Sequence, residues 1–322
     1  MTEKDAPPLN PISLDDVRLY PLKDRKSKVH VEDFSKAWSP GGGFFDWLAT
    51  LPEMLAAGDL KAIARRMAHA ADARKVIILA MGAHPIKVGL NPVIIDLLER
   101  RIISGIAMNG AGIIHDAELA MVGNTSEDVG AGIGTGEFGM AGETGQFLNE
   151  AISEGAANGL GLGESVGAML IRDKFPYNRF SILANAHERN IPVTVHVAMG
   201  TDIIHSHPRA DGAAIGKTSH LDFRLFSALV SRLSDGVFIN LGSAVILPEV
   251  FLKALSLVRN LGHDVKQFTT VNMDFNRHYR PTVNVVQRPT QDGGKGYNLI
   301  GHHEIMFPLL AAAVLEEMNQ NP

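Results

Sequence analysis

The sequence predicts an α/β fold in which helices cover a doubly wound parallel sheet, with further helices added at the N-terminus. Two short apolar runs, 76–81 and 102–108, are rich in β-branched residues and end at glycine-containing turns, as buried parallel strands do. A segment with helical spacing separates them. Strand-like and helix-like segments then alternate over roughly 200 residues without a change in composition, which favours a single domain.

The composition is that of an ordinary globular protein, with 45% hydrophobic and 20% charged residues. The net charge of −5 and the scattered Lys and Arg residues argue against a nucleic-acid partner. The chain has no cysteine, which excludes disulfides, thiolate nucleophiles and Cys-ligated zinc. No apolar run reaches about 18 residues and the N-terminus has no hydrophobic signal region, so we expect a cytoplasmic protein without a membrane partner.

The N-terminal residues form a separate segment. Residues 1–40 are polar and interrupted by prolines, with a basic patch at Lys23–Lys28, and we expect an arm that needs a neighbour to become ordered. Residues 41–322 are predicted to form a single α/β domain. Within it, residues 44–71 have the apolar spacing of two helices packed over the sheet.

Residues 75–116 are predicted to form the first strand–helix–strand unit, with a right-handed crossover. Asn91 is the expected N-cap of its helix, and Pro92 suits the first helical position. The stretches Gly82–Gly89 and Asn109–Asp116 are expected to be loops that stand side by side beyond the carboxyl ends of the strands, where such folds bind ligands. Alternatively, the two stretches only connect elements, and their glycines are there because the turns require positive φ angles.

Two glycine-containing segments resemble phosphate-binding motifs. Residues 130–145, GAGIGTGEFGMAGETG, satisfy GxGxxG, but no strand precedes them, so we expect a flexible or tightly turning loop. Residues 212–220, GAAIGKTSH, resemble a Walker A loop, but Asp211 stands where that motif requires glycine. We therefore reject an NTPase.

The remaining elements are expected in alternation. Short helices are expected near 116–121 and over 179–190, and longer ones over 221–233, 248–262 and 304–318. Strands are expected over 191–199, 236–242, 265–273 and near 298–301.

Several candidate catalytic or ligand-binding side chains follow the predicted strands. His115 beside Asp116 suits general acid/base chemistry, because a carboxylate near an imidazole favours its charged form. His205 and His207 form an HxH pair preceded by Asp202, which indicates either a divalent metal site or hydrogen-bonded histidines. The loop Asp274–Arg280 carries enough donors to hold an anionic ligand, or is simply a solvated loop. The candidate catalytic residues are His115, Asp116, Asp202 and His205.

The order of several segments points to a known family. They are MGAHPIKVGLNPVIIDLLERRIISGIAMNGAGIIHD, NIPVTVHVAMGTD, DGVFINLGSAVILPE, the loop after TTVNM, and MFPLLAAAVLEEM. In order and spacing, over roughly residues 30–320, the chain resembles deoxyhypusine synthase and its bacterial relatives. This resemblance implies a Rossmann-type, doubly wound parallel sheet, NAD as cofactor and a homotetramer. It also implies that Asp202 is a site residue and that the following residues contact NAD: Gly82, Ala83, His84, Asn109, Gly110, Gly112, Asp274, Asn276 and His302.

Departures from the family pattern concern its chemistry. The resemblance places Leu247 at the position of the catalytic lysine, and leucine cannot form an imine. Ile114 and His115 replace the acidic pair that receives the polyamine, and DFNRHYRP replaces an acidic loop. We therefore expect a nucleotide pocket and a small polar ligand, anionic or neutral, rather than deoxyhypusine synthesis. The alternatives are a metal-dependent hydrolase using Asp202, His205 and His207, and a non-catalytic ligand-binding oligomer.

Overall fold

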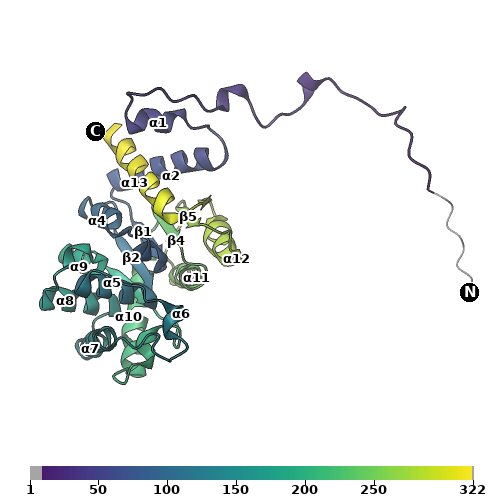
Figure 1. Ribbon diagram of the computed structural model, residues 1–322. Helices are drawn as coiled ribbons and strands as arrows, with labels where there is room; N and C mark the ends of the chain where they lie inside the picture. The colour runs from purple at the N-terminus through teal and green to yellow at the C-terminus, as the bar shows by residue number, and fades with distance from the viewer. Residues whose placement is uncertain (1–8, 321–322) are drawn as a thin grey trace, which may run out of the picture.

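The computed structural model describes residues 9–320 and contains a six-stranded parallel sheet (Figure 1). Its spatial order is β3-β2-β1-β4-β5-β6, so the order reverses between β1 and β4. Every neighbouring pair is parallel. The predicted fold class is confirmed. The strands are β1 (Ile77–Met81), β2 (Gly105–Asn109), β3 (Val193–His196), β4 (Val237–Leu241), β5 (Thr269–Asp274) and β6 (Lys295–Ile300).

The sheet separates two apolar cores. Alternate residues of β1 point to opposite faces, with Ile77 and Leu79 in one core and Ile78 and Ala80 in the other. The second core is formed mainly by α10 (Gly212–Val230) and α11 (Ile246–Asn260). The first core lies under α2 (Leu55–Asp72), α4 (Asn91–Glu99), α5 (Gly110–Val122), α7 (Gly142–Asn158), α8 (Leu162–Asp173), α9 (Ile182–Glu188) and α13 (His303–Gln320).

Short elements complete the chain. These are η1 (Leu22–Asp24), η2 (Val31–Asp33), α1 (Phe44–Thr50), α3 (His84–Lys87), α6 (Val129–Gly132), η3 (Asn178–Phe180), η4 (Ile203–Ser206), α12 (Tyr279–Pro281), the π-helix η5 (Thr282–Gln287) and η6 (Arg288–Thr290). Among the described residues, no helix is both long and apolar enough to cross a membrane.

Residues 9–43 extend away from the body of the molecule (Figure 1). Two backbone hydrogen bonds hold the end of this segment, from Lys36 to Thr50 at 2.9 Å and from Glu53 to Asp33 at 3.0 Å. Large apolar side chains are exposed along it, including Leu9, Ile12, Leu14, Leu19 and Leu22. The segment therefore adds little to the core of its own chain.

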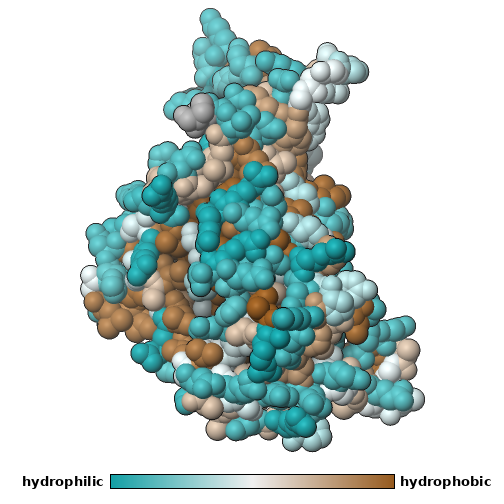
Figure 2. All heavy atoms as spheres, turned by 90° about the vertical axis from the view of Figure 1, so that its left-hand side faces the viewer, coloured by the Kyte–Doolittle hydropathy of each residue, from teal (hydrophilic) through white to brown (hydrophobic). Residues whose placement is uncertain are grey.

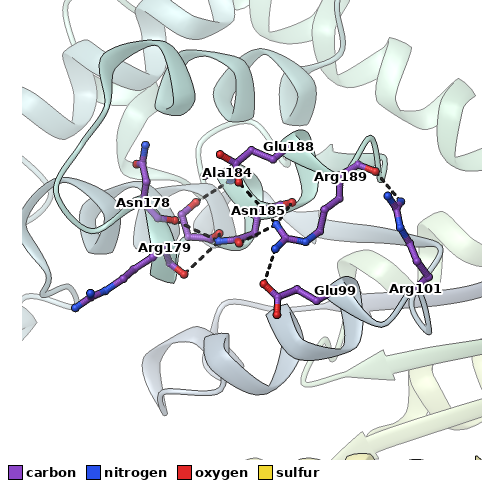
Figure 3. A network of polar contacts seen from close by, with 9 residues as sticks. Glu99, Arg101, Asn178, Arg179, Ala184, Asn185, Glu188 and Arg189 are labelled. Carbon is purple, nitrogen blue, oxygen red and sulfur yellow. Dashed lines mark hydrogen bonds and ion pairs between the residues drawn. The ribbon is translucent and has the colours of Figure 1, made fainter.

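The C-terminal end of helix α9 is fixed to the end of α4 and to the residues that follow α4 (Figure 3). Arg189 forms an ion pair with Glu99 at the end of α4, and it also donates to the backbone and side-chain oxygens of Asn185, each at 3.0 Å. Arg101 donates to the carbonyl of Arg189 at 2.6 Å. These contacts set the position of the turn that leads into β3.

Three expected element boundaries are wrong. The N-cap of α4 is Leu90, and Asn91 is instead buried in the first turn. The stretch 109–116 is not a loop, because α5 starts at Gly110 directly after β2, and Asn109 accepts a hydrogen bond from Gly112 N as its N-cap. Helix α10 begins at Gly212, so the segment that resembles a Walker A loop is its first two turns.

Candidate functional site

The carboxyl ends of the strands carry a cavity of about 210 Å³. Its polar lining comes from the loop after β1, from α5, from the segment after α5 and from the loop after β3. A larger cavity of about 280 Å³ beside Pro192 lies at the amino end of β3, away from these strand ends, so it is not part of the candidate site. The charged or titratable residues that line the cavity at the carboxyl ends are Lys87, His115, Glu118, Glu127 and Asp202.

A hydrogen-bonded relay joins His115 to Glu118. Nδ1 of His115 lies 2.7 Å from Oγ1 of Thr125, and Thr125 in turn donates to Oε2 of Glu118. A hydroxyl has a single hydrogen, so Nδ1 of His115 must be the donor to Thr125. This fixes the tautomer and leaves Nε2 as the ring nitrogen available to a ligand.

Glu118 is held in its ionised form. Burial, the largest single effect, favours the neutral acid, but the nearby imidazole of His115 and the hydrogen bonds from Thr125 and Thr144 together outweigh it and keep the pKa of Glu118 below its ordinary value. The hydrogen bond from Thr144 measures 3.2 Å. The carboxylate can therefore stabilise a positive charge on His115, whose Nδ1 lies 3.7 Å away.

Asp202 follows β3, and its carboxylate packs against Gly110 at the start of α5. A Cβ on Gly110 would overlap Oδ2 of Asp202, so glycine is needed there for the carboxylate to approach the backbone. Burial raises the pKa of Asp202, and the nearby His205 offsets part of this effect. Oδ2 of Asp202 has no hydrogen-bond partner among the described residues. It is therefore a candidate acceptor for a ligand.

The three residues of the alternative metal site do not converge on a common point. Nδ1 of His205 accepts from Gly200 N at 3.0 Å, and Nδ1 of His207 accepts from Arg209 N at 3.2 Å. The ring of His207 packs against Gly145 of α7. Among residues 9–320, no group of three or more His, Cys, Asp or Glu side chains is placed to hold a metal ion. Asp202, His205 and His207 therefore do not form a shared ligand set in the structure, and the alternative of a metal site stays a prediction.

The structure separates Asp116 from the cavity. Its carboxylate is fully buried and accepts hydrogen bonds from Ser181 Oγ at 2.6 Å and from the backbone N–H groups of Ile182 and Leu183 at 2.8 and 3.0 Å. Asn91 donates a fourth at 3.1 Å. Asp116 thus caps the N-terminus of α9, and the acidic partner of His115 is Glu118.

A group of aromatic and imidazole rings, which we term the imidazole cluster, lies beside the switch in strand order. It consists of His84 after β1, Phe275 after β5, and His302 and His303 after β6. The ring centroids of His84 and His303 are 5.1 Å apart, and those of Phe275 and His302 are 6.5 Å apart with nearly parallel planes. Asp274, at the end of β5, lies 3.9 Å from Nε2 of His303.

His303 is the most buried member of this cluster. Burial lowers its pKa, although Asp274 partly opposes the effect, so the neutral ring is favoured. Neither ring nitrogen has a hydrogen-bond partner among the described residues. Gly242, after β4, has φ +65° and lies against this ring, so its lack of a Cβ gives the ring its space. The two ring nitrogens are therefore buried polar atoms without a partner in the described part of the chain, beside the switch point.

The residues expected to contact NAD fall into two groups. Gly82, Ala83, His84, Asp274, Asn276 and His302 lie at the ends of β1, β5 and β6. Asn109, Gly110 and Gly112 lie at the β2–α5 turn, next to Asp202. Helix α3 connects these places, because His84 at its start belongs to the imidazole cluster and Lys87 at its end lines the cavity.

Several residues of this site are not recognisable as site residues from the sequence. Glu118 follows His115 by three positions, a spacing that places both on one helical face, but the expected helix began only near Asp116. No local sequence motif marks Thr125, Glu127 or Lys87 as a ligand-binding residue. The cavity also has three carboxylates against one lysine, which does not fit the expectation of an anionic ligand.

Comparisons with solved structures show proteins that share the fold of this chain. No protein-family model matches the chain, and no curated protein matches it. A conserved protein from Methanococcus maripaludis S2, provisionally assigned as LOR/SDH, gives a TM-score of 0.52 at 17% identity, over 82% of this chain and 71% of that one. ArgZ, an arginine dihydrolase of the ornithine-ammonia cycle in cyanobacteria, gives a TM-score of 0.50 at 15% identity. The match covers 82% of this chain but 33% of ArgZ.

A protein from Entamoeba histolytica, provisionally described as a deoxyhypusine synthase, gives a TM-score of 0.50 at 12% identity. The match covers 88% of this chain and 96% of that protein, so it includes nearly the whole of the Entamoeba fold. At such identities the likeness is one of fold. The chain therefore has a deoxyhypusine synthase-like α/β fold, as the order of its sequence segments predicts.

Proposed function

We propose that the protein binds NAD at the switch point between β1 and β4 and acts on a small polar molecule held in the neighbouring cavity. The observation that carries this proposal is the strand order, which reverses between β1 and β4. In doubly wound sheets, dinucleotides bind outside the carboxyl ends of the strands at such a switch point. Helix α3, which runs from the imidazole cluster to the cavity, would connect the two ligands.

The residues at the switch point suit a nucleotide. Gly82 and Gly242 lie so close that a Cβ on Gly82 would overlap the carbonyl of Gly242, so the loops after β1 and β4 meet backbone to backbone at the switch point. The free nitrogens of His303 and the carboxylate of Asp274 can bond hydroxyl and amide groups. We propose that His84, Asp274 and His302 hold the nucleotide.

The proposed chemistry is a proton transfer coupled to a redox step. Bound NAD would supply a hydride acceptor. Nε2 of His115 would take a proton from the substrate, and the Thr125–Glu118 relay would stabilise the imidazolium. Asp202 and Glu127 would bind a cationic or hydrogen-bond-donating group, because Oδ2 of Asp202 is buried without a donor. Lys87 would pair with an acidic group of the same molecule.

Deoxyhypusine synthesis does not fit this proposal. Leu247 is fully buried in the apolar core beneath α11, so no nucleophile stands at that position. We propose that the fold retains a nucleotide pocket and has a different substrate from the synthases.

A thermal-shift titration with NAD tests the nucleotide site. NAD at a hundredfold excess over its Kd should stabilise the folded protein by about 2.7 kcal/mol. The double variant His84→Ala/His302→Ala should lose most of this stabilisation. His220→Ala, on the exposed surface of α10, is the matched histidine control and should keep it.

Absence of any NAD-dependent shift in the wild-type protein would contradict the proposal. An equal shift in the double variant would contradict the assignment of the residues. Appearance of NADH absorbance with small amines or amino acids would separate an enzyme from a non-catalytic ligand-binding protein.

We infer that the protein forms a homo-oligomer, for which a tetramer is the expected size. Figure 2 shows hydrophobic side chains gathered in patches on the face that carries α4, α8 and α9. The apolar side chains of residues 9–43 are also uncovered. Extensive exposed apolar surface is typical of protein–protein contacts.

A further inference from the structure

A groove at the amino ends of the strands, opposite the candidate site, is lined by several basic side chains. It encloses about 550 Å³ at the amino ends of β4, β5 and β6. Asp235 precedes β4, Gln267 and Thr269 lie at the entry to β5, and Lys295 and Tyr297 belong to β6. The groove is separated from the cavity by the length of the strands.

One face of α2 lines this groove. Ala62, Arg65, Arg66 and His69 occupy positions i, i+3, i+4 and i+7, so they share a single face of the helix. The two arginines and His69 are exposed, whereas Ala62 is small and half-buried. The helix therefore presents three basic side chains above the edge strand β6.

The positive charge in the groove is not compensated by the chain itself. Neither Arg65 nor Arg66 forms an ion pair or hydrogen bond with any residue between 9 and 320. The acid in the groove, Asp235, is already paired with Lys75 at 3.1 Å. Nζ of Lys295 lies 5.2 Å above the ring of Tyr297. Arg65, Arg66 and Lys295 thus line one groove, and none of them forms an ion pair within residues 9–320, in a protein of net charge −5.

Such an arrangement favours an anionic ligand. Like charges in a groove repel, and a concave wall of one sign concentrates the field on a bound counter-ion. Guanidinium groups bind phosphate oxygens in a bidentate way, and the hydroxyl of Thr269 and the amide of Gln267 add uncharged partners. The volume suits a small molecule.

We propose that this groove binds a small phosphorylated molecule with at least two negative charges, held by Arg65, Arg66 and Lys295. Because the groove lies at the amino ends of the strands, its ligand would be distinct from the nucleotide and substrate proposed for the carboxyl ends. The inference does not depend on those assignments.

Calorimetric titration with pyrophosphate and tripolyphosphate at constant ionic strength tests this site. Wild-type protein should bind both anions, with tripolyphosphate the tighter. Lys295→Ala should weaken binding by roughly tenfold, as expected for the loss of one charge-assisted contact. Arg65→Glu/Arg66→Glu should abolish it. Arg224→Glu on the exposed face of α10 is the matched charge-reversal control and should bind like the wild type.

Three outcomes would overturn the inference. The first is an absence of binding to the wild-type protein. The second is equal binding by the Arg65→Glu/Arg66→Glu variant, or by sulfate at matched ionic strength, which would indicate unspecific attraction. The third is a change in molecular mass with this variant but no response to polyphosphate, which would assign the groove to a contact between copies of the chain. Thermal denaturation of each variant without ligand confirms folding.

Discussion

Asp116 connects three elements through one side chain. Its carboxylate, on α5, accepts hydrogen bonds from Ser181, Ile182 and Leu183 at the start of α9 and from Asn91 on α4. Burial raises the pKa of Asp116 to about 6, and these four hydrogen bonds keep it from rising further. The group is therefore ionised at neutral pH and complements the N-terminal dipole of α9.

Replacing Asp116 by Ala should lower the free energy of unfolding by about 3 kcal/mol or more, because buried donors lose their acceptor. Chemical denaturation with urea measures the change. Asp96→Ala is the control, since Asp96 forms only a surface pair with Arg100 and its loss should cost about 0.5 kcal/mol. Equal costs for the two variants would show that Asp116 has no capping role.

Helix α10 protects one of the two edges of the sheet. β3 is an edge strand, and Asp222 of α10 accepts hydrogen bonds from Val195 N at 2.7 Å and from Gly163 N at 2.9 Å. Ser219 donates to the carbonyl of Val195 at 2.8 Å. Side chains of a helix thus take the place of a further strand, which blocks pairing with another chain.

The pH dependence of stability should reveal Asp222. Burial raises its pKa to about 7, against the hydrogen bonds from Gly163 and Val195. A raised carboxyl pKa gives stability that is present below about pH 4 and lost as the pH rises through 7. Relative to Asp222→Asn, the wild-type protein should therefore lose roughly 1.4 kcal/mol per pH unit in that window.

Urea denaturation of both proteins at several values between pH 4.5 and 7.5 measures this difference. Burial also shifts the pKa values of Asp116 and His196, but both residues are present in both proteins, so their pH dependence is common to the two curves. A difference that stays constant with pH would argue against a raised pKa for Asp222.

At the scale of the whole molecule, the arm and the body differ in what they bury. Residues 9–43 contain no fully buried side chain, whereas Leu48 and the helices after it enter the core. We propose that residues 41–322 form one domain and that the arm contacts a neighbouring copy.

Deleting residues 1–40 should change the unfolding free energy of the isolated chain by less than about 1 kcal/mol, because surface segments contribute little. Light scattering should show a smaller assembly than the full-length protein at equal concentration. A loss of cooperative unfolding without a change in mass would show that the arm belongs to the fold of its own chain.

Several parts of the site could be anticipated from sequence. The sequence predicts His84, Asp202 and Asp274 at or after strand ends, because an apolar run followed by a polar turn is visible in it, and the structure has them there. The pairing of His115 with Glu118 through Thr125 was not anticipated, because it depends on where α5 begins and on how the next segment folds back.

By itself the sequence determined the class of fold and the positions of its strands, because burial on both faces requires continuous apolar runs such as those of β1 and β4. Tertiary structure alone decided which side chains line the cavity and the groove and which are buried elsewhere. Adjacent residues on a helix point in different directions, so His115 lines the cavity while Asp116 caps α9. It likewise gathered Arg65, Arg66 and Lys295 into one groove, since the crossover connections bring α2 and β6 together from distant parts of the chain.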